Sequence, residues 1–171
     1  LMNKGLEMIE ARWLFNLAPS QIKVVVHAQS IIHSMVQFED GSIKAQMGLP
    51  DMKLPIQYAM GFPRRIPNTF PRLDFKKYPI LGFEEPDVKT FRNLALATEG
   101  LFKGGNVPCV LNAANEIAVW AFLRNRIGFL DMTAVVEKTM QNVAFIAKPT
   151  LQDYFDSDAE ARNFAASLIN L

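Results

Sequence analysis

The 171-residue sequence contains only one cysteine and two histidines. A single cysteine excludes both a disulfide framework and a metal site built from thiolates. His27 and His33 have no third ligand nearby and no HExxH or CxxC pattern, so local hydrogen bonding is favoured over a zinc site. Cys109 begins a predicted helix, where a thiol pKa can fall, but no histidine lies near it in the sequence. We therefore favour a small buried residue at this position.

Long apolar runs and an excess of charge of either sign are also missing. No run approaches the roughly 20 apolar residues that cross a bilayer, and the charged residues near the start of the sequence lead us to expect no signal peptide. Eighteen basic and seventeen acidic residues give a net charge of +1, which gives no sign of a nucleic-acid partner. With 50% hydrophobic and 20% charged residues, the sequence predicts a folded, soluble, cytoplasmic protein with no membrane partner.

The common nucleotide-binding motifs are absent as well. The sequence has neither GxGxxG after a strand nor GxxxxGK[ST], and therefore predicts no dinucleotide or P-loop site of its own. The chain starts at Leu1 without an initiator methionine, and a helical pattern begins almost at once. Because the ends of domains usually carry a few unpatterned residues, we expect a longer protein to continue upstream.

The first part of the chain predicts a helix followed by a small, mostly antiparallel sheet. Apolar residues at helical spacing cover residues 6–17, and the β-branched run at 22–26 predicts a strand. Two further strand-like runs, at 31–38 and 43–47, flank Asp40-Gly41. Asp-Gly between two such runs is a strong signal for a hairpin.

Prolines are concentrated in the middle of the chain, where they exclude a central strand or a long helix. We expect one short helix at 52–60, followed by an extended linker. Seven of the ten prolines lie in this segment, namely Pro50, Pro55, Pro63, Pro67, Pro71, Pro79 and Pro86.

The remainder of the chain is predicted to be helical. Short loops between helices of this length predict an antiparallel bundle. Ser157 and Glu160 form a capping-box pattern, so the last helix is predicted to begin there. The four predicted helices cover residues 88–103, 108–126, 131–143 and 157–169.

Together these elements predict an α+β fold. It consists of a small, mostly antiparallel sheet with helices, then a proline-rich linker, then a C-terminal antiparallel helical bundle. The predicted domain boundaries are 1–61 for the sheet-containing part, 62–87 for the linker and 88–171 for the bundle.

The densest polar cluster lies at the start of the chain. If this segment is helical, Asn3 and Glu7 lie one turn apart with Lys4 beside them. The amide, the ammonium and the free N–H groups of a helix start can bind phosphate or hydroxyl oxygens. Glu7 can supply one oxygen ligand to Mg²⁺ or Mn²⁺. On pattern alone, an ordinary exposed Lys–Glu pair explains these residues more often.

Four dispersed motifs follow one another along the chain. They are LMNKGLE at residues 1–7, HAQSIIHSMV at 27–36, GLPDM at 48–52 and LNAANE at 111–116. In this order they resemble the C-terminal part of the 1-deoxy-D-xylulose 5-phosphate reductoisomerase family. The resemblance covers essentially the whole chain, and four motifs in order are more specific than any one of them.

The resemblance implies an oxidoreductase of the methylerythritol phosphate route to isoprenoids. Such an enzyme rearranges 1-deoxy-D-xylulose 5-phosphate to an aldehyde, which NADPH reduces to 2-C-methyl-D-erythritol 4-phosphate. A bound Mg²⁺ or Mn²⁺ polarises the substrate. By the family's motif, Glu7 is a metal ligand, and Asn3, Lys4 and Glu7 bind the sugar phosphate. The same resemblance implies that NADPH is bound by a domain upstream of this chain.

Further matches concern the sheet and the bundle. His33 and the segment from Pro50 to Met52 resemble residues close to the family's active site. The hairpin resembles the sheet through which family members form homodimers, as an open sheet edge allows. Asn112 to Glu116 is expected to pack between domains.

The resemblance also implies that this chain alone is inactive. A lone carboxylate cannot hold Mg²⁺ tightly, because hard ions need several oxygen ligands, and the family's other acidic ligands are expected upstream. The alternative is a non-catalytic interaction module that dimerises through the sheet edge and docks partners on its bundle. That alternative explains the sheet, linker and bundle equally well, but leaves the order of the four motifs as coincidence.

Overall fold

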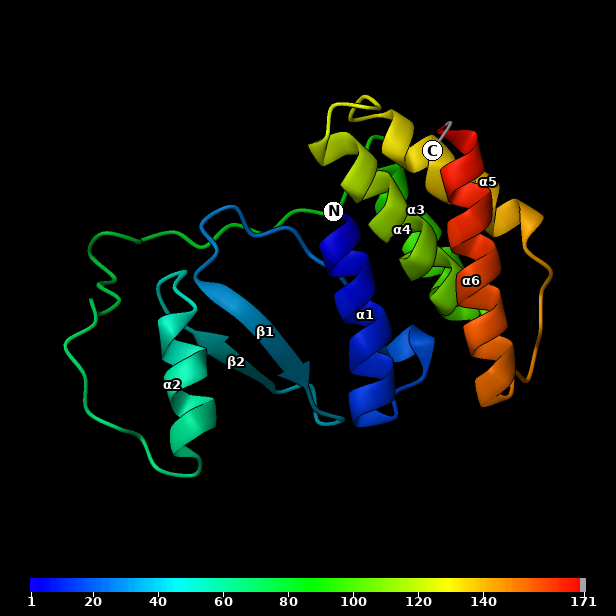
Figure 1. Cartoon of the computed structure of the whole chain (residues 1–171). Coiled ribbons are helices and arrows are strands. Elements are labelled where there is room, and N and C mark those ends of the chain that lie inside the picture. Colours follow the sequence, from blue (N-terminus) through cyan, green and yellow to red (C-terminus); the bar gives the residue numbers. More distant parts are fainter. Residues whose placement is uncertain (170–171) are drawn as a thin grey trace. The chain divides into compact units, whose positions relative to one another are not determined.

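The computed structural model describes residues 1–169, which fall into two compact units. One unit holds residues 1–24 and those from 86 onward, and the other holds residues 25–85. Helices predominate, and a single pair of strands is present in the described residues (Figure 1). This arrangement confirms the predicted α+β class. The elements are α1 Met2–Phe15, η1 Pro19–Gln21, β1 Ile32–Gln37, β2 Ile43–Met47, α2 Lys53–Gly61, α3 Arg92–Lys103, α4 Val107–Leu123, α5 Asp131–Asn142 and α6 Leu151–Leu168.

The helical unit is organised around α4, which packs against α3, α5 and α6. The buried face of α4 is rich in alanine, and such small side chains allow neighbouring helices to approach closely. The core between these helices contains Leu96, Ala97, Leu111, Ala114, Ala118, Val136 and Ala165.

Helix α1 joins this helical unit although it lies far from the bundle in the sequence. It packs on α3, where Met8 is buried together with Leu94 and Leu101. Contacts therefore divide the chain differently from the predicted boundaries 1–61, 62–87 and 88–171, which followed the order of elements along the chain. The apolar stripe of α1 is covered by α3, and sequence order carries no information on that pairing. The last two residues of the predicted bundle lie outside the described residues.

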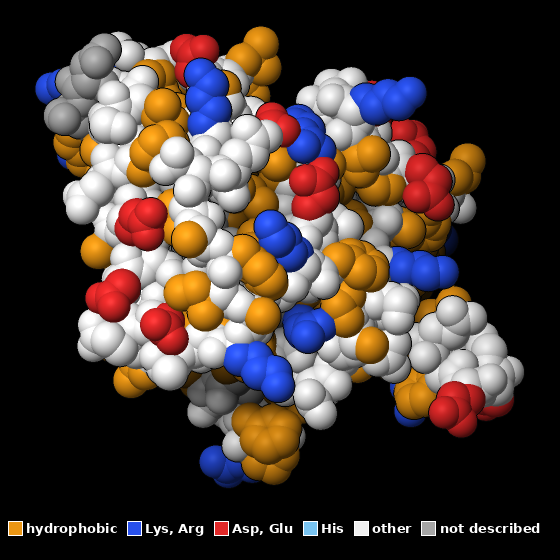
Figure 2. Space-filling model, turned by 90° about the vertical axis from the view of Figure 1, so that its right-hand side faces the viewer, with side chains coloured by type: hydrophobic (Ala, Val, Ile, Leu, Met, Phe, Trp, Pro, Cys, Tyr) orange, Lys and Arg blue, Asp and Glu red, His pale blue; other side chains and the backbone are white. Residues whose placement is uncertain are grey.

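The surface of the protein mixes charges of both signs with apolar side chains. On the face shown in Figure 2, separate lysine and arginine side chains and separate aspartate and glutamate side chains are scattered among apolar and uncharged ones. Charges distributed in this way offset one another at a distance. Among the described residues, no helix combines the length and the apolar character needed to cross a membrane.

The predicted hairpin is confirmed. Strands β1 and β2 pair in antiparallel fashion, with Gln37 opposite Ile43 next to the turn. Gly41 adopts a φ of 85°, which a residue without a side chain adopts readily. Asp40 Oδ1 accepts hydrogen bonds from the Ser42 N–H at 2.9 Å and the Ser42 hydroxyl at 2.6 Å. These bonds satisfy polar groups of the turn and fix its geometry.

The predicted strand at 22–26 is wrong. This run forms only an isolated bridge, in which Val26 and Glu84 exchange two backbone hydrogen bonds of 2.9 Å. A strand needs a continuous partner to satisfy its N–H and C=O groups, and only one residue of the later segment pairs with this run. Next to the bridge, His27 Nδ1 lies 2.7 Å from the Gly82 carbonyl oxygen, which is the local hydrogen bond expected of this histidine.

The proline-rich segment contains no helix or strand between residues 62 and 83, as predicted. It belongs to the same contact unit as the hairpin and α2. The segment contacts α2 directly, because Asn68 Nδ2 donates a 2.6 Å hydrogen bond to Gln57 Oε1. It is therefore folded against its own unit over part of its length, whereas the sequence predicted only an extended linker.

Helix α6 begins earlier than predicted. Its N-cap is Thr150, whose side chain accepts the Asp153 N–H at 3.2 Å, while Asp153 Oδ2 accepts the Thr150 N–H at 2.7 Å. Ser157, which was predicted to begin the helix, is 2% exposed and lies inside it. The capping-box pattern occurs twice in this region, and the first copy forms the cap, whereas Ser157 of the second copy is buried inside the helix.

The capping carboxylate predicts a loss of stability in acid. Hydrogen bonds from the backbone and side chain of Thr150 lower the pKa of Asp153 below its ordinary value of 3.8. A lowered folded-state pKa contributes stability above the unfolded-state value and loses it as pH falls through the folded-state value. We expect Asp153→Asn to lower the thermal unfolding midpoint at neutral pH, and to have less effect below the ordinary carboxyl pKa. Glu160→Gln, on the same helix, serves as the control; an equal effect at both pH values would contradict the prediction.

Candidate active site

The three polar side chains predicted to form the site meet on one face of α1. Asn3 Nδ2 donates a 2.6 Å hydrogen bond to Glu7 Oε1, and Lys4 Nζ forms an ion pair with Glu7 Oε2. Spacings of four and three residues place these side chains one helical turn apart. The Lys4 side chain is 43% exposed and that of Glu7 is 44% exposed. The cluster is therefore accessible to a ligand from solvent.

The bonds to Glu7 orient its carboxylate without locking it. Asn3 and Lys4 each hold one of its two oxygens. Exposed ion pairs of this kind contribute little to stability, so Lys4 can leave Glu7 for an anionic ligand at small cost. The same is true of the Asn3 amide, whose donor group can serve a hydroxyl or phosphate oxygen. The cluster can therefore bind an anion through Lys4 and Asn3 and, next to it, a cation through the Glu7 carboxylate.

A glycine holds α1 against α3 just beside this cluster. Gly5 is buried, and a side chain at this position would collide with the Cβ atom of Ala97 on α3. Gly5 lies between Lys4 and Glu7. Close packing of Gly5 on α3 therefore fixes the position and orientation of the polar cluster relative to the rest of the helical unit. The motif that carries the polar residues thus also carries the residue that positions them.

Gly5→Ala is expected to lower the free energy of unfolding by about 2 kcal/mol, because overpacking forces the two helices apart. Chemical denaturation measures this change. The matched control is Gly100→Ala on α3, where an added Cβ meets its nearest neighbour, Val107, at an ordinary 3.5 Å. There the gain in helix propensity is expected to dominate and to stabilise the protein by up to about 1 kcal/mol. Two effects of the same sign and size would contradict the packing argument.

A hollow of about 360 Å³ adjoins the cluster between α1 and α4. Its wall includes Asn3, Glu7 and Glu10 from α1, and Pro108 and Asn112 from α4. Asn112 was expected to pack between domains, but within the helical unit it borders the same hollow as the predicted site. The sequence offered one signal for it, since Asn112 and Glu116 are spaced one helical turn apart.

Asn112 is connected to an ion-pair network between α4 and α6. Asn112 Nδ2 donates to Glu116 Oε1 at 3.1 Å, and the other Glu116 oxygen pairs with Arg162 of α6 at 2.8 Å. Arg162 also binds Asp158 at 2.7 Å, and these two carboxylates raise the pKa of its guanidinium, Asp158 contributing more. The network ties α4 to α6 and restricts the position of the Asn112 amide.

The donor set around Glu7 fits a hard divalent cation only in part. A carboxylate oxygen and an amide oxygen are suitable ligands for Mg²⁺ or Mn²⁺. In residues 1–169, however, no three His, Cys, Asp or Glu side chains come together in a group that could hold a metal ion. Glu7 can therefore be one ligand of such an ion, but the described residues do not supply a set of three such side chains around it.

The other sequence candidates divide between the two units. His33 on β1 and Met52 just before α2 are both exposed, Met52 to 69%, and Asp51 Oδ1 accepts the Lys53 N–H at 2.9 Å. Their link to a site stays a prediction. Cys109 is half-buried, and burial raises the pKa of its thiol. A reactive thiolate is therefore disfavoured, as the sequence suggested, but the residue is only half-buried and not the fully buried one that we expected.

Curated relatives match almost the whole chain. It is 60% identical over 170 residues to a 1-deoxy-D-xylulose 5-phosphate reductoisomerase of Phocaeicola vulgatus, covering 99% of this chain and 44% of the relative. It is 62% identical over 169 residues to the protein of that name from Bacteroides thetaiotaomicron, covering 99% of this chain and 43% of the relative. The chain thus spans less than half the length of these relatives.

Solved structures agree with the sequence matches. The reductoisomerase from Zymomonas mobilis in complex with NADPH superposes with a TM-score of 0.88 at 49% identity, covering 98% of this chain and 44% of that one. A DOX-P reductoisomerase in complex with NADPH, fosmidomycin and magnesium gives a TM-score of 0.87 at 38% identity, covering 99% of this chain and 44% of that one.

The match to a protein family covers most of the chain. Residues 47–164 match the family described as the DXP reductoisomerase C-terminal domain. The four motifs, the relatives and the solved structures all point to the same assignment. The chain therefore belongs to the DXP reductoisomerase family, of which it forms the C-terminal portion.

Proposed function

We propose that this chain is the C-terminal part of a 1-deoxy-D-xylulose 5-phosphate reductoisomerase that uses NADPH and a divalent metal ion. The product is 2-C-methyl-D-erythritol 4-phosphate, an intermediate of isoprenoid biosynthesis by the methylerythritol phosphate route. The observation that carries the proposal is identity of 60% and 62% to two reductoisomerases over 99% of the chain. Solved neighbours contain NADPH and magnesium, which supports the same two cofactors here.

Each of the three side chains of the polar cluster on α1 has a role in this proposal. Lys4 provides a positive charge and Asn3 a neutral donor for the phosphate and hydroxyl oxygens of the sugar phosphate. Glu7 directs a carboxylate oxygen to Mg²⁺ or Mn²⁺, which when bound polarises carbonyl and hydroxyl oxygens of the substrate. The hydrogen bond from Asn3 to Glu7 (2.6 Å) keeps substrate ligand and metal ligand adjacent, so both can act on one small molecule.

The remaining parts of the reaction are assigned to the longer protein. We place the NADPH-binding domain and the other acidic metal ligands upstream, in the part of the relatives that this chain does not match. We further propose a cytoplasmic homodimer that pairs through the hairpin sheet, with neither a nucleic acid nor a membrane as partner. In the described chain β1 and β2 form a sheet of two strands, so each has an outer edge, which supports further pairing at this sheet.

The proposal predicts a clear difference between two proteins. With 1-deoxy-D-xylulose 5-phosphate, NADPH and Mn²⁺, the 171-residue chain is expected to show no turnover, because one carboxylate does not hold the metal. The chain extended upstream to the length of its relatives is expected to oxidise NADPH in the same assay, followed by NADPH absorbance. Turnover by the short chain would contradict its inactivity. An extended, folded protein that binds Mn²⁺ and NADPH without turnover would contradict the proposed reaction.

A further inference from the structure

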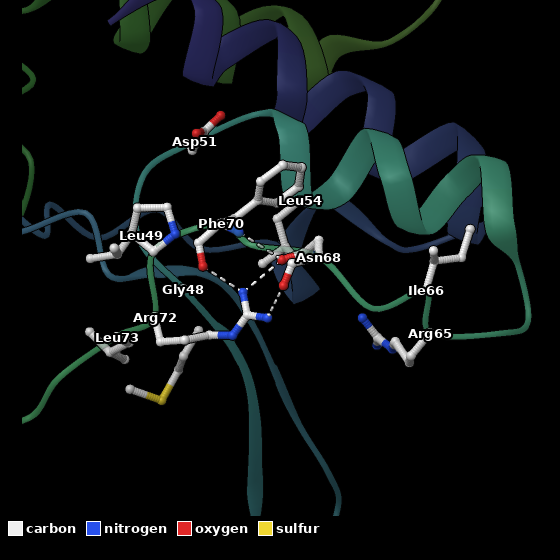
Figure 3. A pocket seen from close by; sticks show the side chains of 12 residues that line it. Gly48, Leu49, Asp51, Leu54, Arg65, Ile66, Asn68, Phe70, Arg72 and Leu73 are labelled. Atoms are coloured by element: carbon white, nitrogen blue, oxygen red, sulfur yellow. Dashed lines mark hydrogen bonds between the residues drawn. The ribbon is translucent and has the colours of Figure 1, made fainter.

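The unit of residues 25–85 contains a pocket of about 330 Å³ whose wall includes Gly48, Leu49 and Asp51 of the GLPDM motif. It is formed by the end of β2, the start of α2 and the proline-rich segment that follows α2. Figure 3 shows the guanidinium group of Arg72 inside it, facing Asn68 and the Phe70 carbonyl. A volume of this order is suited to a small organic ligand.

The proline-rich segment is held in place around this pocket. Asn68 Nδ2 donates to Gln57 Oε1 on α2 at 2.6 Å, and Asn68 Oδ1 accepts the Phe70 N–H at 3.1 Å. Arg72 donates to Asn68 Oδ1 and the Phe70 carbonyl, both at 2.7 Å, and to the Asn68 carbonyl at 2.8 Å. These hydrogen bonds hold the wall of the pocket in a defined conformation. A ligand would therefore bind to a preformed site, and little conformational entropy of the chain would be lost on binding.

The pocket has positive charge that nothing in its own unit neutralises. Arg72 donates only to neutral oxygens, and Arg65 lies over the Tyr58 ring at 3.5 Å. Within residues 1–169 no ion pair joins either guanidinium to a carboxylate. The one acidic residue of the wall, Asp51, is already bound to the Lys53 N–H at 2.9 Å and its ammonium at 3.5 Å. An anion can therefore gain charge-assisted hydrogen bonds here.

The rest of the wall is apolar. Leu49, Leu54, Ile66, Phe70 and Leu73 line it, and they give an apolar group a surface to cover that a free inorganic anion cannot use. We propose that this pocket binds a small amphipathic anion, namely an aromatic or aliphatic group that carries a phosphate or a carboxylate. The two arginines bind the anionic head and the leucine and isoleucine side chains contact the apolar body.

Methyl NMR on the 171-residue chain tests this proposal with four probes: phenyl phosphate, benzoate, inorganic phosphate and benzyl alcohol. Phenyl phosphate is expected to shift the methyl signals of Leu49, Leu54 and Ile66. Inorganic phosphate has only the anionic group and benzyl alcohol only the aromatic ring. Each is expected to bind at least about tenfold more weakly than phenyl phosphate. Benzoate tests the carboxylate form of the ligand, and its failure to bind would overturn that half of the proposal and leave only phosphates as ligands.

Two substitutions locate the charge requirement. Arg65→Gln and Arg72→Gln are expected to weaken phenyl phosphate binding about tenfold each, while Arg64→Gln, a neighbouring arginine outside the wall, leaves it unchanged. If Arg72→Gln alters the spectrum of the free protein, Arg65→Gln decides, because among residues 1–169 no hydrogen bond joins Arg65 to the wall. Absence of methyl shifts, equal binding of benzyl alcohol, or an equal loss in Arg64→Gln would overturn the proposal.

Discussion

Glu7→Gln, made in the protein extended to the length of its relatives, is expected to lower metal-dependent turnover by about a hundredfold or more. Replacing a residue that only supports a metal ligand typically lowers metal affinity or activity roughly 10- to 100-fold. Loss of a charged ligand itself should lower them at least as much. The amide keeps the size of the side chain and still accepts from Asn3, whereas it removes the negative charge that the cation needs. Initial rates measured over a range of Mn²⁺ concentrations show the effect as a higher metal requirement and a lower maximal rate.

The fold is expected to survive this change. The Glu7 side chain is 44% exposed, and surface substitutions of this kind usually change stability by no more than about 0.5 kcal/mol. Glu160→Gln removes an exposed carboxylate from α6 of the same unit and is expected to leave turnover and its metal dependence unchanged. A Glu7→Gln protein with normal metal dependence would show that the carboxylate is only a partner of Lys4, and the site would have to be sought elsewhere.

The clustering of the three candidate side chains could be predicted because one helix contains them all. Asn3, Lys4 and Glu7 are local in sequence, so helical spacing alone brings their side chains together. The wall of the hollow next to them could not be predicted in the same way. Asn112 reaches it only because α1 packs near α4, and contacts between distant elements leave no periodic signal in one sequence.

The hairpin and the helical segments were predictable for a similar reason. The Asp40-Gly41 turn and the helical periodicity act over a few residues, and their signals are strong. The run at 22–26 has the composition of a strand, but a strand also needs a partner strand, and the composition of the run does not show whether one is present. At α6, two equivalent capping patterns compete, and burial of Ser157 decides between them, which is a property of the folded core.

Asn106→Ala is expected to lower the free energy of unfolding by about 3 kcal/mol, because it leaves several buried polar groups without partners. Asn106 is 1% exposed. Its Oδ1 accepts the Ile146 N–H at 2.9 Å, and its Nδ2 donates to the Ala144 carbonyl at 2.9 Å and to Ser157 Oγ at 3.0 Å. One side chain thus joins the start of α4 to the segment before α6 and to α6 itself. Urea denaturation of the 171-residue chain measures the loss.

A double-mutant cycle separates this network from a simple loss of packing. The Ser157→Ala and Asn106→Ala changes share one hydrogen bond, so their combined cost is expected to be smaller than the sum of the two single costs. Asn142→Ala, at the exposed end of α5, removes an amide that is not buried and is expected to change stability by no more than about 0.5 kcal/mol. If Asn106→Ala costs no more than Asn142→Ala, or if the costs at 106 and 157 simply add, the buried amide does not connect these elements. The α4–α6 packing would then rest on apolar contacts and on the Glu116–Arg162 ion pair.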